Sequence, residues 1–357
     1  MNANLVNQYV FLSCMIACLL TSSCHKSQEP SSHNDPSKYR LSEDVLWASP
    51  DDFDLTMDIY TPHSKKGTYP VIVMFHGGGW LINDKSIMEQ AAAYIATNAN
   101  YVVCNVNYRL LSDKENSIQL HEIVNDAFGA VLWVKDNISL YAGDGSRIAV
   151  TGDSAGAHLS AMIINMGNQL SSEPFSLSSP RFKPSYLSPG RTAEEIAKQN
   201  GLEVQAGVLS YGAFDVYQAA IAGFETLKNP FWVASGSLGR GIFGDDFNVV
   251  DHPNIYRAVS PIHNIPNAAY RLLPPQLLTV GSEDSLATPA SVKSYRELLQ
   301  SAGHTARYWE YHGKSHAFLD SGSNVFLGSD FETDAPEALN VMIEFLDEIF
   351  FPDQSAT

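Results

Sequence analysis

Residues 147–162 read RIAVTGDSAGAHLSAM: an apolar strand, a tight turn with a serine at its apex, and the start of a helix. The turn, from Gly152 to Gly156, has the pattern G-x-S-x-G, whose small residues let the chain reverse where larger side chains would clash. Such a strained turn holds the serine hydroxyl clear of the backbone at the N-terminus of the helix. Ser154 is therefore the candidate nucleophile.

A glycine-rich stretch closes an earlier apolar run. Residues 69–74 (YPVIVM) are suited to a buried strand, and residues 75–80 (FHGGGW) follow directly. Glycines let the main chain turn its amides inward and leave no side chain in the way of a substrate. Backbone N–H groups aimed at a developing oxyanion are commonly the largest electrostatic contribution to acyl transfer. The residues assigned to this oxyanion hole are Gly77, Gly78, Gly79 and, directly after the serine, Ala155.

Four further residues near these motifs have simpler expected roles. We expect His76 to brace the glycine loop and Asp153 to hold the serine turn, with neither taking part in proton transfer. His158 lies within the helix and is expected to be structural. Trp80 either lines the acyl pocket or packs in the core, and both alternatives stay open.

The serine also needs a base and an acid. A serine hydroxyl is a poor nucleophile until a base takes its proton, and the base needs an orienting carboxylate. In enzymes with this turn, the acid and then the histidine follow the serine along the chain. A strand predicted at 275–280 is followed by Glu283 and Asp284. We favour Asp284, because Gly-x-x-Asp-x-Leu is the usual spacing in this class.

The histidine is expected after the last strand, which is predicted at 307–311. His312 directly follows that strand, whereas His316 lies far enough into the loop to reach over the serine. We favour His316 as the general base. Ser154, Asp284 and His316 supply the whole acid–base path, so no metal ion and no organic cofactor is implied.

Apolar segments of two kinds alternate along the chain. Continuous apolar runs at 69–75 and 101–107 are typical of buried parallel strands, and helical patterns cover 85–98, 118–138 and 336–350. This alternation predicts an α/β fold with a mainly parallel sheet and helices on both faces. Further strands are predicted at 45–49, 55–60, 147–151 and 204–210.

Two stretches, 167–199 and 213–265, break the alternation. We expect both to be insertions that form a lid over the carboxyl edge of the sheet, where ligands bind in such folds. No second domain is needed, and a single domain of residues 44–352 is predicted.

Composition excludes one class of partner. The formal net charge is −17, and phosphate binding needs clustered Lys and Arg, so no nucleic-acid partner is expected. Three of the four cysteines fall in the first 24 residues, which leaves Cys104 as a small apolar residue of the core and excludes a disulfide within the folded domain.

The first 23 residues contain no Asp, Glu, Lys or Arg, and Val10 to Leu20 is nearly continuous apolar sequence. That run is shorter than a membrane span and suits a signal peptide, predicted at 1–23. Small residues directly before Cys24 resemble the lipobox of a bacterial lipoprotein, in which that cysteine is acylated and anchored to a membrane. A freely secreted protein and an uncleaved anchor are the alternatives. Residues 24–43, rich in Ser, Pro, Asn and Asp, are predicted to be a flexible tether.

Taken together, these motifs resemble the α/β-hydrolase carboxylesterases of the hormone-sensitive-lipase-like branch. The resemblance covers residues 69–318 and implies Ser154 as nucleophile, His316 as base, Asp284 as its orienter, and the glycine loop with Ala155 as oxyanion hole. The matching segments are 76–80 (HGGGW), 107–110 (NYRL), 141–144 (YAGD), 152–156 (GDSAG), Asp284 and His316.

The resemblance departs from true hormone-sensitive lipases at the N-terminus, where their long helical cap has no counterpart. An exported protein of this compact form is similar to the bacterial esterases that remove acetyl or feruloyl groups from plant polysaccharides. We therefore expect a serine carboxylesterase that acts through an acyl-enzyme on short-chain or carbohydrate-linked esters. The alternatives are an arylformamidase-like amidase and a non-catalytic binding protein on the same scaffold. The oligomeric state is not predicted.

Overall fold

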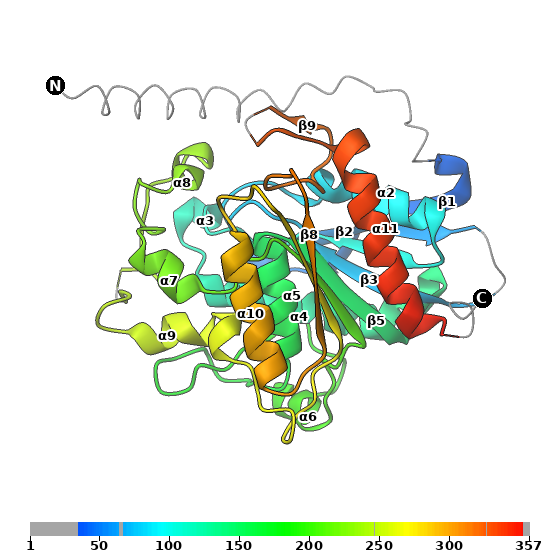
Figure 1. Cartoon of the computed structure of the whole chain (residues 1–357). Helices are drawn as coiled ribbons and strands as arrows, with labels where there is room; N and C mark the ends of the chain where they lie inside the picture. The colour runs from blue at the N-terminus through cyan, green and yellow to red at the C-terminus, as the bar shows by residue number, and fades with distance from the viewer. Residues whose placement is uncertain (1–34, 64–66, 246, 326, 353–357) are drawn as a thin grey trace.

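The computed structural model describes residues 35–63, 67–245, 247–325 and 327–352. Its centre is an eight-stranded sheet in the order β1-β2-β4-β3-β5-β6-β7-β8 (Figure 1). The first two strands pair antiparallel, β2 is antiparallel to β4, and all strands from β4 to β8 in this order run parallel. The strands are β1 Tyr39–Ala48, β2 Leu55–Pro62, β3 Tyr69–Phe75, β4 Val102–Val106, β5 Gly143–Asp153, β6 Ala206–Ser210, β7 Gln276–Gly281 and β8 Ala306–Tyr311.

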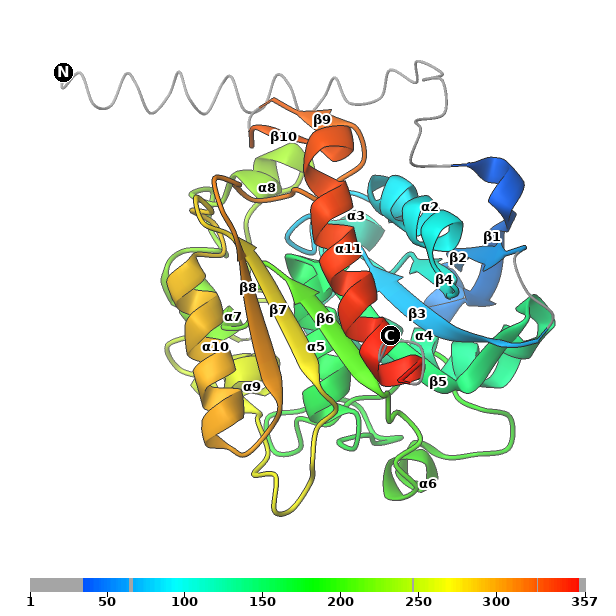
Figure 2. The same ribbon diagram turned by 45° about the vertical axis from the view of Figure 1, so that its right-hand side comes forward.

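The middle strands are apolar along their whole length because helices cover both faces of the sheet. Every residue of β3, β4, β6 and β7 is buried, as parallel strands between two helical layers require. On one face α2 packs against α11, and on the other α4 packs against α5, with α10 beside β7 and β8 (Figures 1 and 2). These helices are α2 Glu89–Asn98, α4 Leu120–Asn137, α5 Ala155–Met166, α10 Pro289–Ser301 and α11 Phe331–Phe350.

Shorter elements connect the layers. Among its described residues, the segment between β6 and β7 carries three short α-helices and one 3-10 helix, and a two-stranded hairpin precedes α11. The short elements are η1 Pro36–Lys38, η2 Pro50–Asp52, η3 Lys85–Met88, α3 Asp113–Asn116, η4 Ile138–Tyr141, α6 Ala193–Lys198, α7 Val216–Ile221, α8 Pro230–Ala234, α9 Pro253–Ala258, η5 Pro261–His263, β9 Ser323–Asn324 and β10 Ser329–Asp330.

The N-terminal boundary differs from the predicted tether of 24–43. Asp35 caps η1 by accepting a hydrogen bond from the Ser37 amide, and β1 begins at Tyr39. The Tyr39 ring packs against Tyr60 of β2 with 5.4 Å between ring centroids, so pairing with the edge of the sheet fixes this stretch. The predicted signal peptide, Cys24 and the rest of the tether lie outside the described residues.

The first insertion, 167–199, does not cover the carboxyl edge as predicted. It starts where α5 ends, and α5 runs antiparallel to the strands, so the insertion begins at the amino edge, where α6 lies (Figure 1). From there it packs on the outside of α4: the Phe182 ring lies 5.3 Å from that of Phe128, and the Ser185 amide donates to the Asn125 carbonyl at 3.0 Å.

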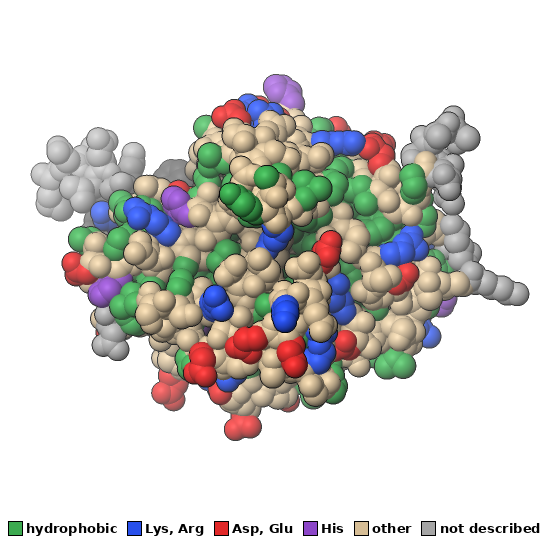
Figure 3. Space-filling view, turned by 90° about the horizontal axis from the view of Figure 1, so that it is seen from below, with side chains coloured by type: hydrophobic (Ala, Val, Ile, Leu, Met, Phe, Trp, Pro, Cys, Tyr) green, Lys and Arg blue, Asp and Glu red, His purple; other side chains and the backbone are tan. Residues whose placement is uncertain are grey.

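Two further observations bear on surface and membrane. Within the described residues, no helix is both long and apolar enough to cross a bilayer. Figure 3 looks onto the molecule from below, at the amino edge, and acidic and basic side chains are interspersed over this face.

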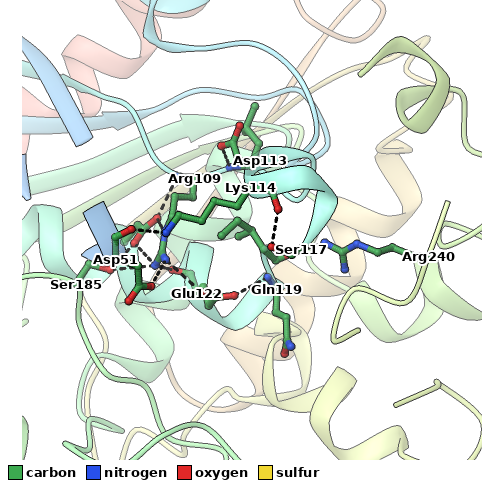
Figure 4. A network of polar contacts seen from close by, with 12 residues as sticks. Asp51, Arg109, Asp113, Lys114, Ser117, Gln119, Glu122, Ser185 and Arg240 are labelled. Carbon is green, nitrogen blue, oxygen red and sulfur yellow. Dashed lines mark hydrogen bonds and ion pairs between the residues drawn. The ribbon is translucent and has the colours of Figure 1, made fainter. Parts of the chain in front are cut away.

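A buried ion-pair network fixes the loop after β4 (Figure 4). Arg109 is 3% exposed, and its Nε and Nη2 donate to the two carboxylate oxygens of Asp126 on α4 at 2.9 and 2.8 Å. Its Nη1 donates to Glu122 at 3.1 Å, and the Ser185 hydroxyl of the first insertion donates to Asp126. The network therefore joins strand, helix and insertion through one guanidinium.

Removing this guanidinium should destabilise the fold. Arg109→Met leaves the fully buried Asp126 carboxylate without its cation, and breaking a buried pair in this way costs about 3 kcal/mol. Urea unfolding measures the loss. The matched control is Arg307→Met, whose pair with Glu348 is about half exposed and should leave the unfolding midpoint nearly unchanged. Equal effects of the two substitutions would contradict the assignment.

Candidate active site

The serine turn is forced by close packing. β5 ends at Asp153, Ser154 has φ 49° and ψ −111°, and α5 begins at the next residue. A Cβ on Gly156 would lie 1.9 Å from the Phe75 carbonyl oxygen, and one on Gly152 would lie 2.4 Å from the Gly156 carbonyl carbon. Only glycine fits at either position. The Ser154 amide donates to the Ser210 carbonyl at 2.9 Å, which fixes the turn over the end of β6.

The structure brings together the favoured acid and base. His316 Nδ1 donates to Asp284 Oδ2 at 2.7 Å, and both side chains are buried. The other oxygen of Asp284 accepts from the amides of Leu286 and Ala287 at 2.8 and 2.9 Å, so the carboxylate is held in one orientation. With Nδ1 engaged, Nε2 is the nitrogen of His316 that can receive a proton from a serine.

The alternative acid and the alternative base both lie on the surface. Glu283 and His312 are both exposed. The ring of His316 is supported instead by buried Tyr211, whose ring centroid is 4.6 Å away. Ser154 and His316 line the same cavity, which places the hydroxyl and the imidazole on one side of the sheet's carboxyl edge.

The glycine loop passes through the left-handed region of backbone conformation, which glycine favours and Trp80 adopts against its preference. Gly78, Gly79 and Trp80 all have positive φ, of 111°, 61° and 61°. The Gly78 carbonyl accepts from the amides of Leu81 and Ile82 at 3.1 Å, which turns the loop back on itself. Within the described chain, the amides of Gly78, Gly79 and Ala155 donate to no internal acceptor, as expected for donors kept for a bound oxyanion.

Gly77 is placed differently from the prediction. Gly77 lies against the Asp153 carboxyl, and its backbone N–H opposes the rise that burial causes in the pKa of that carboxyl. A Cβ on Gly77 would lie 2.2 Å from Asp153 Oδ2, so glycine is required here for contact with the carboxyl and not for contact with a substrate. Gly78, Gly79 and Ala155 line or adjoin the cavity without such a contact, and the role of the Gly77 amide in the oxyanion hole stays a prediction.

His76 braces the loop, as expected. Its Nδ1 donates to the Gly77 carbonyl at 2.8 Å, and its ring stacks on Tyr108 at 4.3 Å. The Tyr108 hydroxyl donates to the His76 carbonyl at 2.6 Å. Burial lowers the pKa of His76 to about 4, so the imidazole is neutral at physiological pH and adds no charge to the site.

His158 and Trp80 form a second brace. Trp80 Nε1 donates to His158 Nδ1 at 3.2 Å, and His158 Nε2 donates to the Val259 carbonyl at 2.7 Å. Burial lowers the pKa of His158 to about 4, which keeps it neutral and structural. Trp80 is 2% exposed and also lines the cavity, so it both packs in the core and faces the pocket.

The cavity above Ser154 has a volume of about 450 Å³. Its wall on the side of the glycine loop is aromatic: Phe231 lies 3.2 Å from the Cβ position of Gly79, and the ring of Phe224 lies 5.4 Å from that of Trp80. Both phenylalanines come from the second insertion, 213–265, and none of the lining residues comes from 167–199. The sequence gives no period or motif that marks these phenylalanines.

One further acidic residue near the site has no signal in the sequence. Asp320 follows His316 by four positions, and its Oδ1 is buried without a hydrogen-bond partner among the described residues. Among all the residues that the structure describes, no group of three or more His, Cys, Asp or Glu side chains is placed so that it could hold a metal ion.

The parallel sheet, the serine turn after β5, the acid after β7 and the histidine after β8 define an α/β-hydrolase. The BD-FAE family model matches residues 57–299, and the chain belongs to this family.

Individual relatives are similar over part of their length. Carboxylesterase NlhH of Mycobacterium tuberculosis is 32% identical over 121 residues, 34% of this chain and 37% of the relative. Esterase LipQ of the same organism is 27% identical over 250 residues, 70% of this chain and 50% of the relative. The chain thus spans half or less of the length of these two curated relatives.

Solved structures share the fold. Thermogutta terrifontis esterase 2 superposes with a TM-score of 0.61 at 20% identity, covering 91% of this chain and 96% of that one. A truncated carbohydrate esterase from gut microbiota superposes with a TM-score of 0.64 at 21% identity, covering 90% of this chain and 99% of that one.

The Asp284–His316 pair should set the rate at which a fluorophosphonate probe labels Ser154. The Asp284→Asn protein should react at least about 100-fold more slowly, because the imidazole loses its orienting carboxylate and holds the wrong tautomer. Glu283→Gln changes an exposed neighbour and should label at the unaltered rate. Intact-protein mass spectrometry follows both reactions. The reverse pattern would assign the acid to Glu283.

Proposed function

We propose that this protein is a serine carboxylesterase that works through an acyl-enzyme. One observation supports this above all: the hydrogen-bonded pair Asp284–His316 and the serine turn open onto one cavity, beside amides with no internal acceptor. An enzyme of this kind needs a nucleophile, an oriented base and an oxyanion site in one place.

The reaction follows from these positions. As the Ser154 oxygen attacks the ester carbonyl, His316 Nε2 takes the hydroxyl proton, and Asp284 stabilises the imidazolium. The carbonyl oxygen becomes an oxyanion that the amides of Gly78, Gly79 and Ala155 can bind. Collapse of the intermediate breaks the bond to the alcohol oxygen, which leaves with the proton from His316. Water, deprotonated by the same imidazole, then releases the acid and restores the serine.

The cavity supports a small or aromatic ester as substrate. A volume of about 450 Å³ is near the lower end of small-molecule sites, and the wall of Trp80, Phe224 and Phe231 offers flat apolar surface. Leu286 lines the mouth and is 54% exposed, so a larger alcohol portion could extend outward. Short-chain and carbohydrate-linked esters, acetyl or feruloyl, fit this shape. The gut carbohydrate esterase of similar fold is consistent with that choice.

Hydrolysis of p-nitrophenyl acetate by the purified protein tests the proposal. Ser154→Ala should lower kcat at least about 1000-fold, because it removes the nucleophile. A panel of acetylated xylan, methyl ferulate, longer p-nitrophenyl acyl esters and N-formylkynurenine then ranks the substrates by kcat/KM. Hydrolysis that persists in Ser154→Ala would refute the mechanism, and preference for N-formylkynurenine would assign an arylformamidase instead.

We further propose that the protein is exported and anchored by acylation of Cys24. The support is the uncharged apolar leader and the small residues before this cysteine. Expression in a bacterial host should give a mature protein that begins at Cys24 and carries added lipid mass. Cys24→Ala should abolish that mass and the membrane fraction, whereas Cys104→Ala, in the buried core, should keep both. Membrane association in Cys24→Ala without lipid would indicate an uncleaved anchor.

A further inference from the structure

His158 lies between three parts of the site and contacts all of them. It stands on α5, one turn after Ser154, and its side chain is fully buried. One ring nitrogen is 3.2 Å from the indole nitrogen of Trp80, at the end of the glycine loop (residues 76–80), and the other is 2.7 Å from the Val259 carbonyl of the second insertion. One imidazole therefore links the helix after the nucleophile, the glycine loop and the insertion that supplies the aromatic wall.

The two partners of His158 fix its tautomer. A carbonyl oxygen only accepts hydrogen bonds, so Nε2 carries the proton, and an indole N–H only donates, so Nδ1 keeps its lone pair. Burial lowers the pKa of His158 to about 4, which leaves this neutral form in place at physiological pH. Both ring nitrogens are thus engaged, and neither is available for proton transfer in the reaction.

The glycine loop needs anchors because its glycines have no side chains to hold them. Before the glycines, His76 donates to the Gly77 carbonyl at 2.8 Å. After them, Trp80 has a φ of 61°, a left-handed conformation that a bulky residue keeps only when its surroundings hold it. The Trp80 carbonyl accepts from the Leu111 amide at 2.8 Å, and the Trp80 indole is held by His158.

The second insertion also reaches the loop by packing. The ring of Phe224 lies 5.4 Å from that of Trp80 in an edge-to-face arrangement, and a ring carbon of Phe231 lies 3.2 Å from the Cβ position of Gly79. Apolar contacts have no preferred direction, whereas a hydrogen bond sets both a distance and an angle. The bond from His158 to the insertion therefore adds a directional link to contacts that would otherwise allow sliding.

We propose that His158 is a positioning residue for the oxyanion hole. By holding the Trp80 indole against the second insertion, it fixes the end of the glycine loop and with it the direction of the Gly79 amide. This role rests on the proposed function, because the amide concerned binds the oxyanion of acyl transfer. A displaced loop would weaken that hydrogen bond in both acylation and deacylation, since each passes through a tetrahedral intermediate.

The bond between the two side chains can be tested without any substrate. In a proton–nitrogen correlation spectrum, the indole N–H of Trp80 is assigned as the signal that Trp80→Phe lacks. It should move upfield in His158→Leu, because it loses its acceptor. His158→Gln supplies an oxygen that accepts from the indole and an N–H that donates to Val259, so it should restore most of the displacement. An indole signal that stays in place in His158→Leu would overturn the proposal.

His304 offers a matched control. It is also buried, its Nε2 donates to the Pro266 carbonyl at 2.7 Å, and its Nδ1 accepts from the Leu273 amide at 3.3 Å. It lies just before β8, at the amino edge of the sheet, and does not line the cavity. Loss of either histidine leaves buried partners unpaired and should lower the unfolding temperature, but only loss of His158 should change the kinetics.

Kinetics on p-nitrophenyl acetate tests the positioning role. His158→Leu should lower kcat about 10- to 100-fold with little change in KM, as expected when a donor to the transition state is displaced. His158→Gln should recover most of this loss, and His304→Leu should keep the unaltered kcat. Trp80→Phe breaks the same bond from the other side and should also lower kcat, which keeps the test decisive if His158→Leu does not fold.

The two substitutions at this bond should not be additive. Because both act through one hydrogen bond, His158→Leu combined with Trp80→Phe should be no slower than the slower single variant. Additive losses, an unaltered kcat in Trp80→Phe, or equal kcat values for His158→Leu and His304→Leu would make His158 a packing residue only, and the esterase assignment would stand. If no ester is hydrolysed at all, the proposed function fails, and the indole signal still decides whether His158 holds Trp80.

Discussion

The approach of the end of β3 to the start of α5 is the contact on which the site depends. Gly156 lies so close to the Phe75 carbonyl that a single added carbon would sit 1.9 Å from the oxygen. This contact places His76, the first residue of the glycine loop after β3, directly beside the serine turn. Since both segments follow neighbouring parallel strands, they leave the sheet at the same edge, and the amides of Gly79 and Ala155 open onto one cavity.

The remaining parts of the site are held by polar groups that are themselves buried. The Asp284 carboxylate is oriented by the amides of Leu286 and Ala287, and the Tyr108 hydroxyl by the His76 carbonyl. The Trp80 indole donates to His158, whose other ring nitrogen is bonded to the Val259 carbonyl. The side chains of Glu283 and His312, in the same loops, are exposed and do not line the cavity.

Much of the fold and of the candidate site could be predicted from local signals. Continuous apolar runs marked β3 and β4, and the glycine patterns marked both loops, because tight turns restrict which residues fit. α10 escaped prediction because its buried face consists of only Val292, Tyr295 and Leu299 in a polar helix. The path of 167–199 depends on contacts with α4 that are distant in sequence. For the same reason neither the contact of Gly77 with Asp153 nor the aromatic wall could be anticipated.

The aromatic wall has a consequence for how this scaffold can change. Phe224 and Phe231 reach the cavity from one continuous stretch between β6 and β7, whereas the nucleophile, base and acid stand on strand ends of the sheet. Part of the cavity wall is thus encoded apart from the nucleophile, the base and the acid, whereas Trp80 and Leu286 belong to the same loops as the catalytic groups. Substitutions at Phe224 and Phe231 could therefore change which ester fits without disturbing the strand ends, whereas Val259 of the same stretch accepts a hydrogen bond from His158 and so helps to hold Trp80.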